Sequence, residues 1–315
     1  MGKIEAQNWK DLIKVYAAEL GFVAVGITGA DPVYELERVL EQRVLGKHAT
    51  PFEDRDIRRR IDPKEICPLC KSIIALAYPL PLSAPANNGQ GQLARSAVGE
   101  DYHKVLRNKC GELVDKLKQT GWMMKSNPII QVDNGPLNER AFALRAGLGF
   151  IGRNHQLIVP GYGSFVALGL ILLDQALPPD QPLEKDCGNC TRCLEVCPAQ
   201  LLGEEEFKAN RCLSYLTQSK ETLADADLKL FGKRIFGCDS CQDVCPFNYS
   251  RIRLEQEAGL NRGVNLRELL NLSKSDFNHK FKHTAAGWRG KTILQRNAAI
   301  AAYNTGEPSL EQCGI

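Results

Sequence analysis

The chain has 315 residues, of which 43% are hydrophobic and 24% are charged, and its formal net charge at pH 7 is +3. This length is sufficient for two domains, and the small net charge excludes a protein that is a polycation over its whole surface. The longest apolar run, residues 165–173, is too short to cross a bilayer, so it predicts a buried strand and no membrane association.

Helix-like and strand-like patterns alternate along the amino-terminal part of the chain. They predict, in order, helix 8–20, strand 22–27, helix 33–44, strand 72–78, helix 101–119, strand 129–132, a helix through 139–145, and strands 156–159 and 164–173. Asn8 is the expected N-cap of the first helix, and residues 81–91, rich in Pro, Asn and Gly, are an expected loop. Gly161 and Gly163 form the expected turn of the last strand pair. After Asn248 the chain is polar and helical, with a last helix over 292–303. This alternation predicts an α/β or α+β sandwich.

Eight of the twelve cysteines fall within residues 187–245. The first four have the C-x2-C-x2-C-x3-C-P spacing of bacterial ferredoxins, in which three thiolates bind one 4Fe–4S cluster and the fourth binds a second cluster. A second run, from Cys238 to Cys245, lacks one cysteine because Ile235 occupies its place, and Cys212 is the available substitute. The spacing predicts two ligand sets: Cys187, Cys190, Cys193 and Cys245 for cluster 1, and Cys197, Cys212, Cys238 and Cys241 for cluster 2.

A zinc ribbon also uses paired C-x2-C hooks, but zinc needs only four ligands. It would explain neither the three cysteines of the first run nor the two C-x3-C-P endings, so we prefer two clusters. Iron–sulfur thiolates and the lack of an apolar signal sequence predict a reducing, cytoplasmic location. Because clusters carry electrons one at a time, the rest of the chain is expected to hold an electron acceptor.

Two shorter motifs have weaker interpretations. Gly147, Gly149 and Gly152 form G-x-G-x-x-G, but they follow a predicted helix and not a strand, which argues against a dinucleotide site. We interpret them as positions where the backbone passes close to something bulky. Cys67 and Cys70 form an isolated C-x2-C, for which a buried pair is favoured over redox-active thiols.

Three further features leave alternatives open. Asp133 ends a strand within a turn rich in Gly and Pro, where an aspartate often bonds its own backbone in an Asx-turn. His155 is a possible metal ligand, although a single histidine more often makes an ordinary hydrogen bond. Basic residues are bunched at 55–60 and 280–296, where a solvated surface is the favoured interpretation.

Taken together, seven segments resemble the epoxyqueuosine reductase family, which is related to the reductive dehalogenases. The matching segments, in chain order and over nearly the whole length, are 54–63, 99–103, 132–136, 145–154, 212–218, 237–239 and 288–291. The turn at Asp133 and the Trp-Arg-Gly-Lys segment that begins at Trp288 are its most specific parts. Members of the family often continue into a helical repeat, whereas this chain stops soon after Tyr303, which leaves open how much of the tRNA contact is present.

The resemblance implies an α+β fold in three parts. These are a nitroreductase-like cobalamin-binding catalytic domain over residues 1–178, a ferredoxin-like domain with two 4Fe–4S clusters over 179–250, and a helical, tRNA-contacting segment over 251–315. It implies that Asp133 is the catalytic acid. It also implies cobalamin contacts at Arg60, Asp133, Asn154, His155, Leu157, Leu168, Ser214 and Asp239. The tRNA contacts expected from it are Lys220, Arg289 and Lys291.

The activity implied is reduction of the epoxide of epoxyqueuosine, a modified wobble base in a tRNA anticodon stem-loop, to the alkene of queuosine. Cob(I)alamin would act as nucleophile on an epoxide carbon while Asp133 protonates the departing oxygen, and a flavodoxin or ferredoxin would supply electrons. A well-placed acid is worth about a hundred- to ten-thousandfold in such a step. Two alternatives are a dehalogenase-like reductase of a small molecule and a non-catalytic carrier of electrons. A reductase of a small molecule would not need the late basic segment. A carrier of electrons would not need the folded amino-terminal domain.

Overall fold

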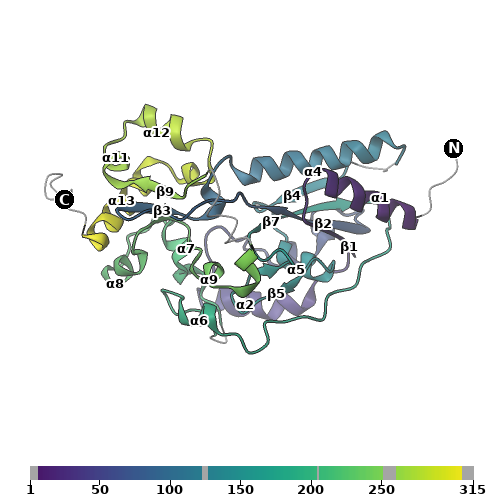
Figure 1. Cartoon of the computed structure of the whole chain (residues 1–315). Helices are drawn as coiled ribbons and strands as arrows, with labels where there is room; N and C mark the ends of the chain where they lie inside the picture. The colour runs from purple at the N-terminus through teal and green to yellow at the C-terminus, as the bar shows by residue number, and fades with distance from the viewer. Residues whose placement is uncertain (1–5, 123–126, 204–205, 251–259, 307–315) are drawn as a thin grey trace. The chain divides into compact units, whose positions relative to one another are not determined.

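The computed structural model describes residues 6–122, 127–203, 206–250 and 260–306, and the chain divides into two compact units (Figure 1). The first unit contains residues 1–79 and 103–190, and the second contains 80–102 and 191–315. This division differs from the three consecutive segments expected from the sequence, because residues 80–102 group with the carboxy-terminal part. Residues 251–259 and 307–315 of the expected helical segment lie outside the described residues.

A four-stranded antiparallel sheet forms the centre of the first unit. Its order is β1 (Ala24–Gly29), β2 (Ser72–Pro79), β7 (Val166–Leu173) and β4 (Ile129–Val132). The first six residues of β2 are all buried, as expected for a strand covered on both faces. The predicted strands 72–78 and 129–132 are therefore confirmed, while the first strand begins two residues later than predicted.

Helices cover both faces of this sheet (Figure 1). Helices α1 (Ala6–Glu19) and α4 (Tyr102–Gln119) lie beside each other on one face: Trp9 stacks on Trp122 at 5.4 Å between ring centroids, and the ammonium of Lys116 lies 2.9 Å from the carboxylate of Glu19. The other face packs on α5 (Glu139–Arg145), whose Phe142 is fully buried in the core. Because α1 begins at Ala6, Asn8 lies inside the helix and is not its N-cap, contrary to the prediction.

Two short strands, β5 (Phe150–Ile151) and β6 (Leu157–Ile158), form a hairpin within the first unit. The predicted pairing of the 156–159 strand with the following strand is wrong: β6 pairs with β5, and only an isolated bridge joins Val159 to Gly163. The preceding part of the unit contains a 3₁₀ turn over Tyr34–Leu36 and helices α2 (Glu37–Leu45) and α3 (Ile57–Ile61).

The second unit is built on a three-stranded sheet in the order β8 (Arg234–Phe236), β3 (Gln90–Leu93) and β9 (Gly263–Asn265). Strand β3 is parallel to β8 and antiparallel to β9. It begins inside the segment that was expected to be a loop. A β-carbon at Gly91 would lie 2.6 Å from Leu266 and 2.8 Å from Ile235, so only glycine allows this close packing.

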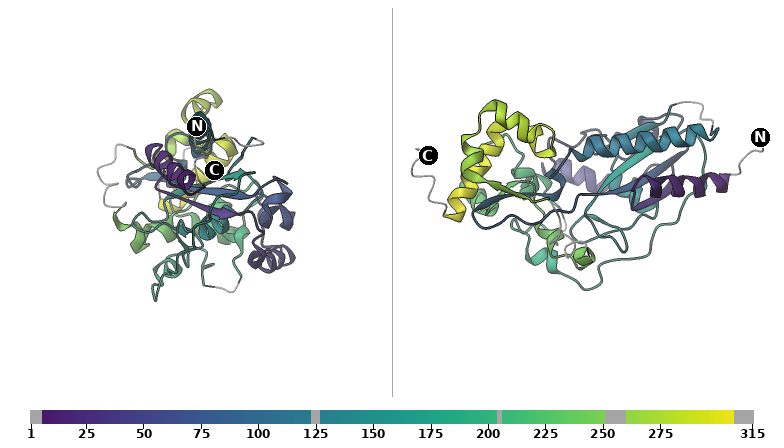
Figure 2. Two further views of the ribbon diagram at one scale, coloured as in Figure 1. Left: turned by 90° about the vertical axis from the view of Figure 1, so that its right-hand side faces the viewer. Right: turned by 45° about the horizontal axis from the view of Figure 1, so that its top comes forward.

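The last helices pack on this sheet (Figure 2, right view, yellow-green). They are α11 (Leu266–Asn271), α12 (Lys274–Phe281) and α13 (Lys291–Thr305). In α13, the buried Asn297 donates hydrogen bonds to the carbonyls of Thr217 and Ile235, at 2.6 and 2.9 Å. The predicted last helix is thus confirmed. Within the described ranges no helix is long and apolar enough to cross a membrane.

Candidate active site and cluster ligands

Asp133 occupies the turn that follows strand β4. Its backbone has φ of 54°, a left-handed conformation that is uncommon outside glycine, and its side chain is 52% exposed. The carboxylate Oδ2 lies 2.7 Å from Nε2 of His103, at the start of α4, and the backbone N–H donates to Oε1 of Glu139 at 2.5 Å. A contact with His103, 30 positions away, and one with Glu139, six positions away, therefore hold this aspartate in a strained turn, as is common for functional residues.

Glu139, in the first turn of α5, accepts the backbone N–H of Asp133 and so holds the turn that contains Asp133. Its Oε1 also accepts a hydrogen bond from Nε2 of Gln131 at 3.1 Å. Burial, and then the nearby carboxylate of Asp133, raise the pKa of Glu139 to about 8. The carboxyl of Glu139 is therefore largely protonated at neutral pH.

Further charged groups of the first unit surround this turn. Glu53 pairs with Arg60 at 2.9 Å and with Arg43 at 3.3 Å, and the guanidinium of Arg140 donates to the carbonyl of His155 at 2.5 Å. Arg140 interacts electrostatically with Arg43, Glu53, Glu139 and Asp133. Burial, followed by repulsion from Arg140 and Arg43, lowers the pKa of His155, which favours a neutral imidazole. Arg60 and His155, both predicted site residues, thus belong to one electrostatic group with Asp133.

The hairpin loop before β6 presents Asn154. Its side chain is 4% exposed, and Oδ1 accepts the backbone N–H of Gln156 at 3.2 Å. The buried Nδ2 has no hydrogen-bond partner among the described residues. A buried amide nitrogen in this state is able to donate to a bound molecule or to an ordered water. Leu157 is part of the hydrophobic core and Leu168 packs against it, so these two shape the unit from inside.

In the glycine-rich segment 147–152, two glycines lie against backbone of the same unit. A β-carbon at Gly147 would lie 2.3 Å from the carbonyl oxygen of Gln181, and one at Gly149 would lie 2.2 Å from that of Ile158. The expected bulky neighbour of these two glycines is therefore backbone of the same unit.

Four of the predicted cluster ligands lie together in the second unit. Burial, and then the neighbouring thiols of Cys238 and Cys197, raise the pKa of Cys212 to about 11. Burial also raises the pKa of Cys241, with smaller contributions from Cys238, Cys212 and Cys197. These thiols are the set predicted for cluster 2, and binding of iron would offset the cost of ionising them. Among the described residues, no three His, Cys, Asp or Glu side chains converge on one point as the ligands of a single metal ion do. A cluster does not require this, because each of its thiolates binds a different iron.

The ligands predicted for cluster 1 are divided between the units, with Cys187 and Cys190 in the first and Cys193 and Cys245 in the second. Within the first unit, the backbone N–H of Arg153 points at Sγ of Cys187 over 3.5 Å, and the guanidinium of Arg153 donates to the carbonyl of Gly188 at 3.1 Å. The hairpin loop that carries Asn154 therefore contacts a predicted cluster ligand directly.

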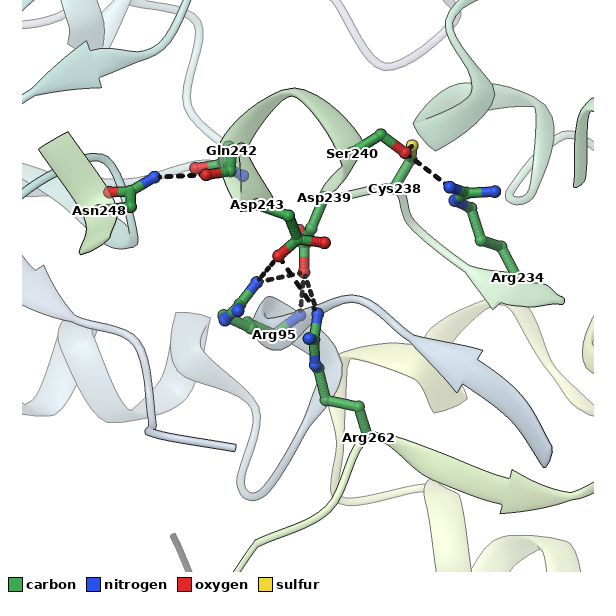
Figure 3. A network of polar contacts seen from close by, with 9 residues as sticks. All are labelled: Arg95, Arg234, Cys238, Asp239, Ser240, Gln242, Asp243, Asn248 and Arg262. Atoms are coloured by element: carbon green, nitrogen blue, oxygen red, sulfur yellow. Dashed lines mark hydrogen bonds and ion pairs between the residues drawn. The ribbon is translucent and has the colours of Figure 1, made fainter. Parts of the chain in front are cut away.

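Asp239, a predicted cobalamin contact, is the centre of a buried ion network in the second unit (Figure 3). Its Oδ2 accepts the backbone N–H of Arg95 at 2.8 Å and lies 3.5 and 3.3 Å from the guanidinium groups of Arg95 and Arg262. Arg95 also contacts Asp243 at 2.5 Å. Ser214, the other predicted cobalamin contact of this unit, is half-buried, and its carbonyl accepts hydrogen bonds from Thr217 and Gln218.

The three residues predicted to contact tRNA differ in their surroundings. Lys220 is exposed. Arg289 donates to the carbonyl of Gln218 at 2.6 Å and stacks on the ring of Trp288, and Lys291 donates to the carbonyl of Leu272 at 3.2 Å. Arg289 and Lys291 thus also stabilise the fold of the second unit.

Sequence reasoning gave no role to His103, Glu139, Arg95 or Arg262. His103 belongs to a segment that matches the family, but its partner is 30 positions away. Glu139 lies only six and eight positions from its partners Asp133 and Gln131, but no motif marks that spacing. Arg95 and Arg262 have no local sequence signal, since their partner Asp239 is 144 and 23 positions away.

The chain is similar to known proteins in both its cluster region and its amino-terminal unit. Residues 186–248 match the family described as "4Fe-4S double cluster binding domain", and residues 60–131 match "Epoxyqueuosine reductase QueG, DUF1730". The epoxyqueuosine reductase of Bacillus subtilis is 38% identical over 305 residues, covering 93% of this chain and 78% of that protein.

Two solved structures are similar over 97% of this chain and 84% of theirs, each with 34% identity and a TM-score of 0.87. One is an epoxyqueuosine reductase with a tRNA-Tyr epoxyqueuosine-modified stem loop. The other is the Bacillus subtilis epoxyqueuosine reductase with an aspartate-bearing catalytic loop swung out of the active site.

Proposed function

This chain belongs to the epoxyqueuosine reductase family, and we propose that Asp133 is the acid of its reaction. The protein is an oxidoreductase that reduces the epoxide of epoxyqueuosine in tRNA to the alkene of queuosine. Removal of the epoxide oxygen as water consumes two electrons and two protons. The reaction therefore needs a source of paired electrons and a group that protonates the departing oxygen.

The position of Asp133 is the observation that carries the proposal. The carboxylate projects from a turn whose backbone is bonded to Glu139, and it contacts the imidazole of His103. Half of the side chain is accessible, so a substrate oxygen is able to approach it. Asp133 donates its proton to that oxygen as the carbon–oxygen bond breaks, and the contact with His103 orients the carboxyl and offers a route for its reprotonation.

Cobalamin is the cofactor we assign to the first unit. When bound, it supplies a two-electron nucleophile, which one-electron iron–sulfur clusters cannot provide by themselves. The unpartnered Nδ2 of Asn154 fits an amide or phosphate oxygen of such a large polar ligand. The guanidinium of Arg60 and the neutral imidazole of His155 belong to the same electrostatic group as Asp133 and would hold polar substituents of cobalamin. Leu157, Leu168, Ser214 and Asp239 remain proposed cobalamin contacts on the strength of the family resemblance alone.

The remaining assignments follow from the family. We propose a nitroreductase-like fold for the cobalamin-binding part and a ferredoxin-like fold around the clusters, whose ligand sets are those predicted from the cysteine spacing. The mutual proximity of Cys197, Cys212, Cys238 and Cys241 supports the second set. An external flavodoxin or ferredoxin would supply electrons. A cytoplasmic setting, which keeps thiols reduced, suits eight cluster ligands.

Replacement of Asp133 by Asn tests the acid directly. Asn keeps the size and the turn but has no acidic proton, so Asp133→Asn should bind cobalamin and tRNA and lose most turnover, about a hundredfold or more. The measurement is single-turnover conversion of epoxide-containing tRNA by pre-reduced enzyme, with Asn134→Ala in the same turn as control. If Asp133→Asn retains turnover within a few-fold of the parent, Asp133 is not the acid.

A further inference from the structure

The hydroxyl of Ser240 lies between an arginine and a predicted cluster ligand in the second unit (Figure 3). Its Oγ is 2.7 Å from a guanidinium nitrogen of Arg234 and 3.3 Å from Sγ of Cys238. Ser240 is the first residue of α9 (Ser240–Asp243), and Arg234 is the first residue of β8. Three residues from two adjoining segments therefore form a short relay that ends on sulfur.

The direction of this relay follows from the chemistry of its members. A guanidinium only donates hydrogen bonds, so Oγ of Ser240 must use a lone pair to accept from Arg234. The single hydroxyl proton is then available for the other neighbour, Sγ of Cys238. A thiolate bound to iron has no proton and only accepts. In the cluster-bound protein, Ser240 therefore donates to Cys238.

The surrounding network fixes Ser240 in this place. The preceding residue, Asp239, is held by the backbone N–H of Arg95 and by the guanidinium of Arg262, at 2.8 and 3.3 Å. Its carbonyl accepts the N–H of Gln242 at 2.8 Å. On the other side, Arg234 is anchored by a hydrogen bond from its guanidinium to the carbonyl of Phe231 at 3.2 Å. The relay is thus preorganised at both ends.

We propose that Ser240 and Arg234 raise the reduction potential of the cluster that Cys238 binds, an inference that rests on the ligand set proposed above. Reduction adds a negative charge that is shared with the ligand sulfurs. A hydrogen bond to one of these sulfurs, strengthened by the positive charge of Arg234, stabilises the reduced state more than the oxidised state. Ser240 acts through Cys238 and is a positioning residue. Its effect is to help this cluster accept electrons from the external donor.

The test is a potentiometric titration of the reconstituted iron–sulfur protein without cobalamin, followed by electron paramagnetic resonance. Ser240→Ala should lower the midpoint potential of one cluster and leave the other unchanged. The expected size is about a tenfold change in the ratio of reduced to oxidised cluster at a fixed potential, which is about 59 mV for a one-electron couple. Arg234→Gln should shift the same cluster in the same direction.

Two controls separate this effect from general damage. Ser240→Thr keeps the hydroxyl and should keep the parent potential, and Ser273→Ala removes a serine that caps α12, so it should leave both potentials unchanged. If Ser240→Ala holds two full clusters at unchanged potentials, the inference is overturned while the proposed function stands. If Ser240→Ala loses a cluster, Arg234→Gln replaces it in the test. Two full clusters at unchanged potentials in Arg234→Gln would then overturn the inference. If Cys238→Ser keeps both clusters, the ligand assignment fails and this inference fails with it.

Discussion

The imidazole Nε2 of His103 and the carboxylate Oδ2 of Asp133 lie 2.7 Å apart, although the two residues are 30 positions apart in the sequence. Helix α4 and the end of strand β4 meet at this contact, so the fold of the first unit places a proton-transferring side chain against the proposed acid. Glu139 accepts the backbone N–H of Asp133 and so holds the turn, while His103 holds the side chain.

His103→Phe should slow single-turnover conversion of epoxide-containing tRNA about tenfold or more, because it removes the group that orients and reprotonates Asp133. Cobalamin binding and cluster content should be unchanged. Arg107→Ala is the matched control: it lies one turn further along α4 and also contacts β4, through the carbonyl of Ile130 at 3.1 Å, but it does not contact Asp133 in this way. Equal losses in both variants would show that His103 acts only by packing α4 on the sheet.

Glu139 should make the stability of the protein depend on pH. The folded state raises the pKa of Glu139 from 4.5 to about 8, so the folded protein binds this proton more strongly than the unfolded chain does. Stability from this group is therefore fully present below pH 4.5 and decreases as the pH rises towards 8. Glu139→Gln keeps the oxygen that accepts the N–H of Asp133 and should remove this contribution. Thermal unfolding of both proteins between pH 5 and 9 measures the difference, and parallel curves would contradict the assigned pKa.

The parts of the site that sequence reasoning found are those with local signals. Cysteine spacing predicts the clusters because consecutive ligands lie within a few residues of one another. The turn at Asp133 is flanked by a strand and by Gly and Pro, which mark its position. The helices and strands of the first unit were also recognised from their periodicity, with errors mainly at boundaries such as the start of α1.

The parts that were missed depend on contacts between distant segments. Strand β3 has a loop-like composition and becomes a strand because it pairs with β8 and β9, more than 130 positions away, which also transfers residues 80–102 to the second unit. The hairpin of β5 with β6 was missed for a related reason, since both strands have only two residues. The partners of Asp239 come from two such distant segments, at Arg95 and Arg262. No local pattern encodes these pairings.

Cys212→Ser should damage the same cluster as Cys197→Ser, because Cys212 is expected to replace the ligand that is missing from the second cysteine run. The thiols of Cys238 and Cys197 lie close enough to Cys212 to raise the pKa of its thiol. Iron content should fall by about half in either variant, and the paramagnetic signal of the same reduced cluster should disappear. Cys110→Ser is the control, since Cys110 is a fully buried cysteine of α4 in the first unit. Full iron content and both signals in Cys212→Ser would refute the ligand set.

Lys220 gives the cleanest test of the predicted tRNA contacts. Its side chain is exposed, whereas Arg289 and Lys291 donate to backbone carbonyls of the second unit, so their removal also affects stability. Each lysine that neutralises a phosphate releases a counterion on binding. Lys220→Ala should therefore weaken tRNA binding and reduce the slope of log affinity against log salt concentration by about one, with no change in melting temperature.

The companion variant is Lys291→Ala, which should show the same change of slope together with a lower melting temperature, because the hydrogen bond to the carbonyl of Leu272 is lost. Lys274→Ala, at the start of α12, serves as a control for the loss of one positive charge elsewhere in the second unit. Binding is measured over a range of salt concentrations with an anticodon stem-loop. Unchanged slopes in Lys220→Ala and Lys291→Ala would leave these residues with a structural role only, and the phosphate contacts would have to come from other basic residues.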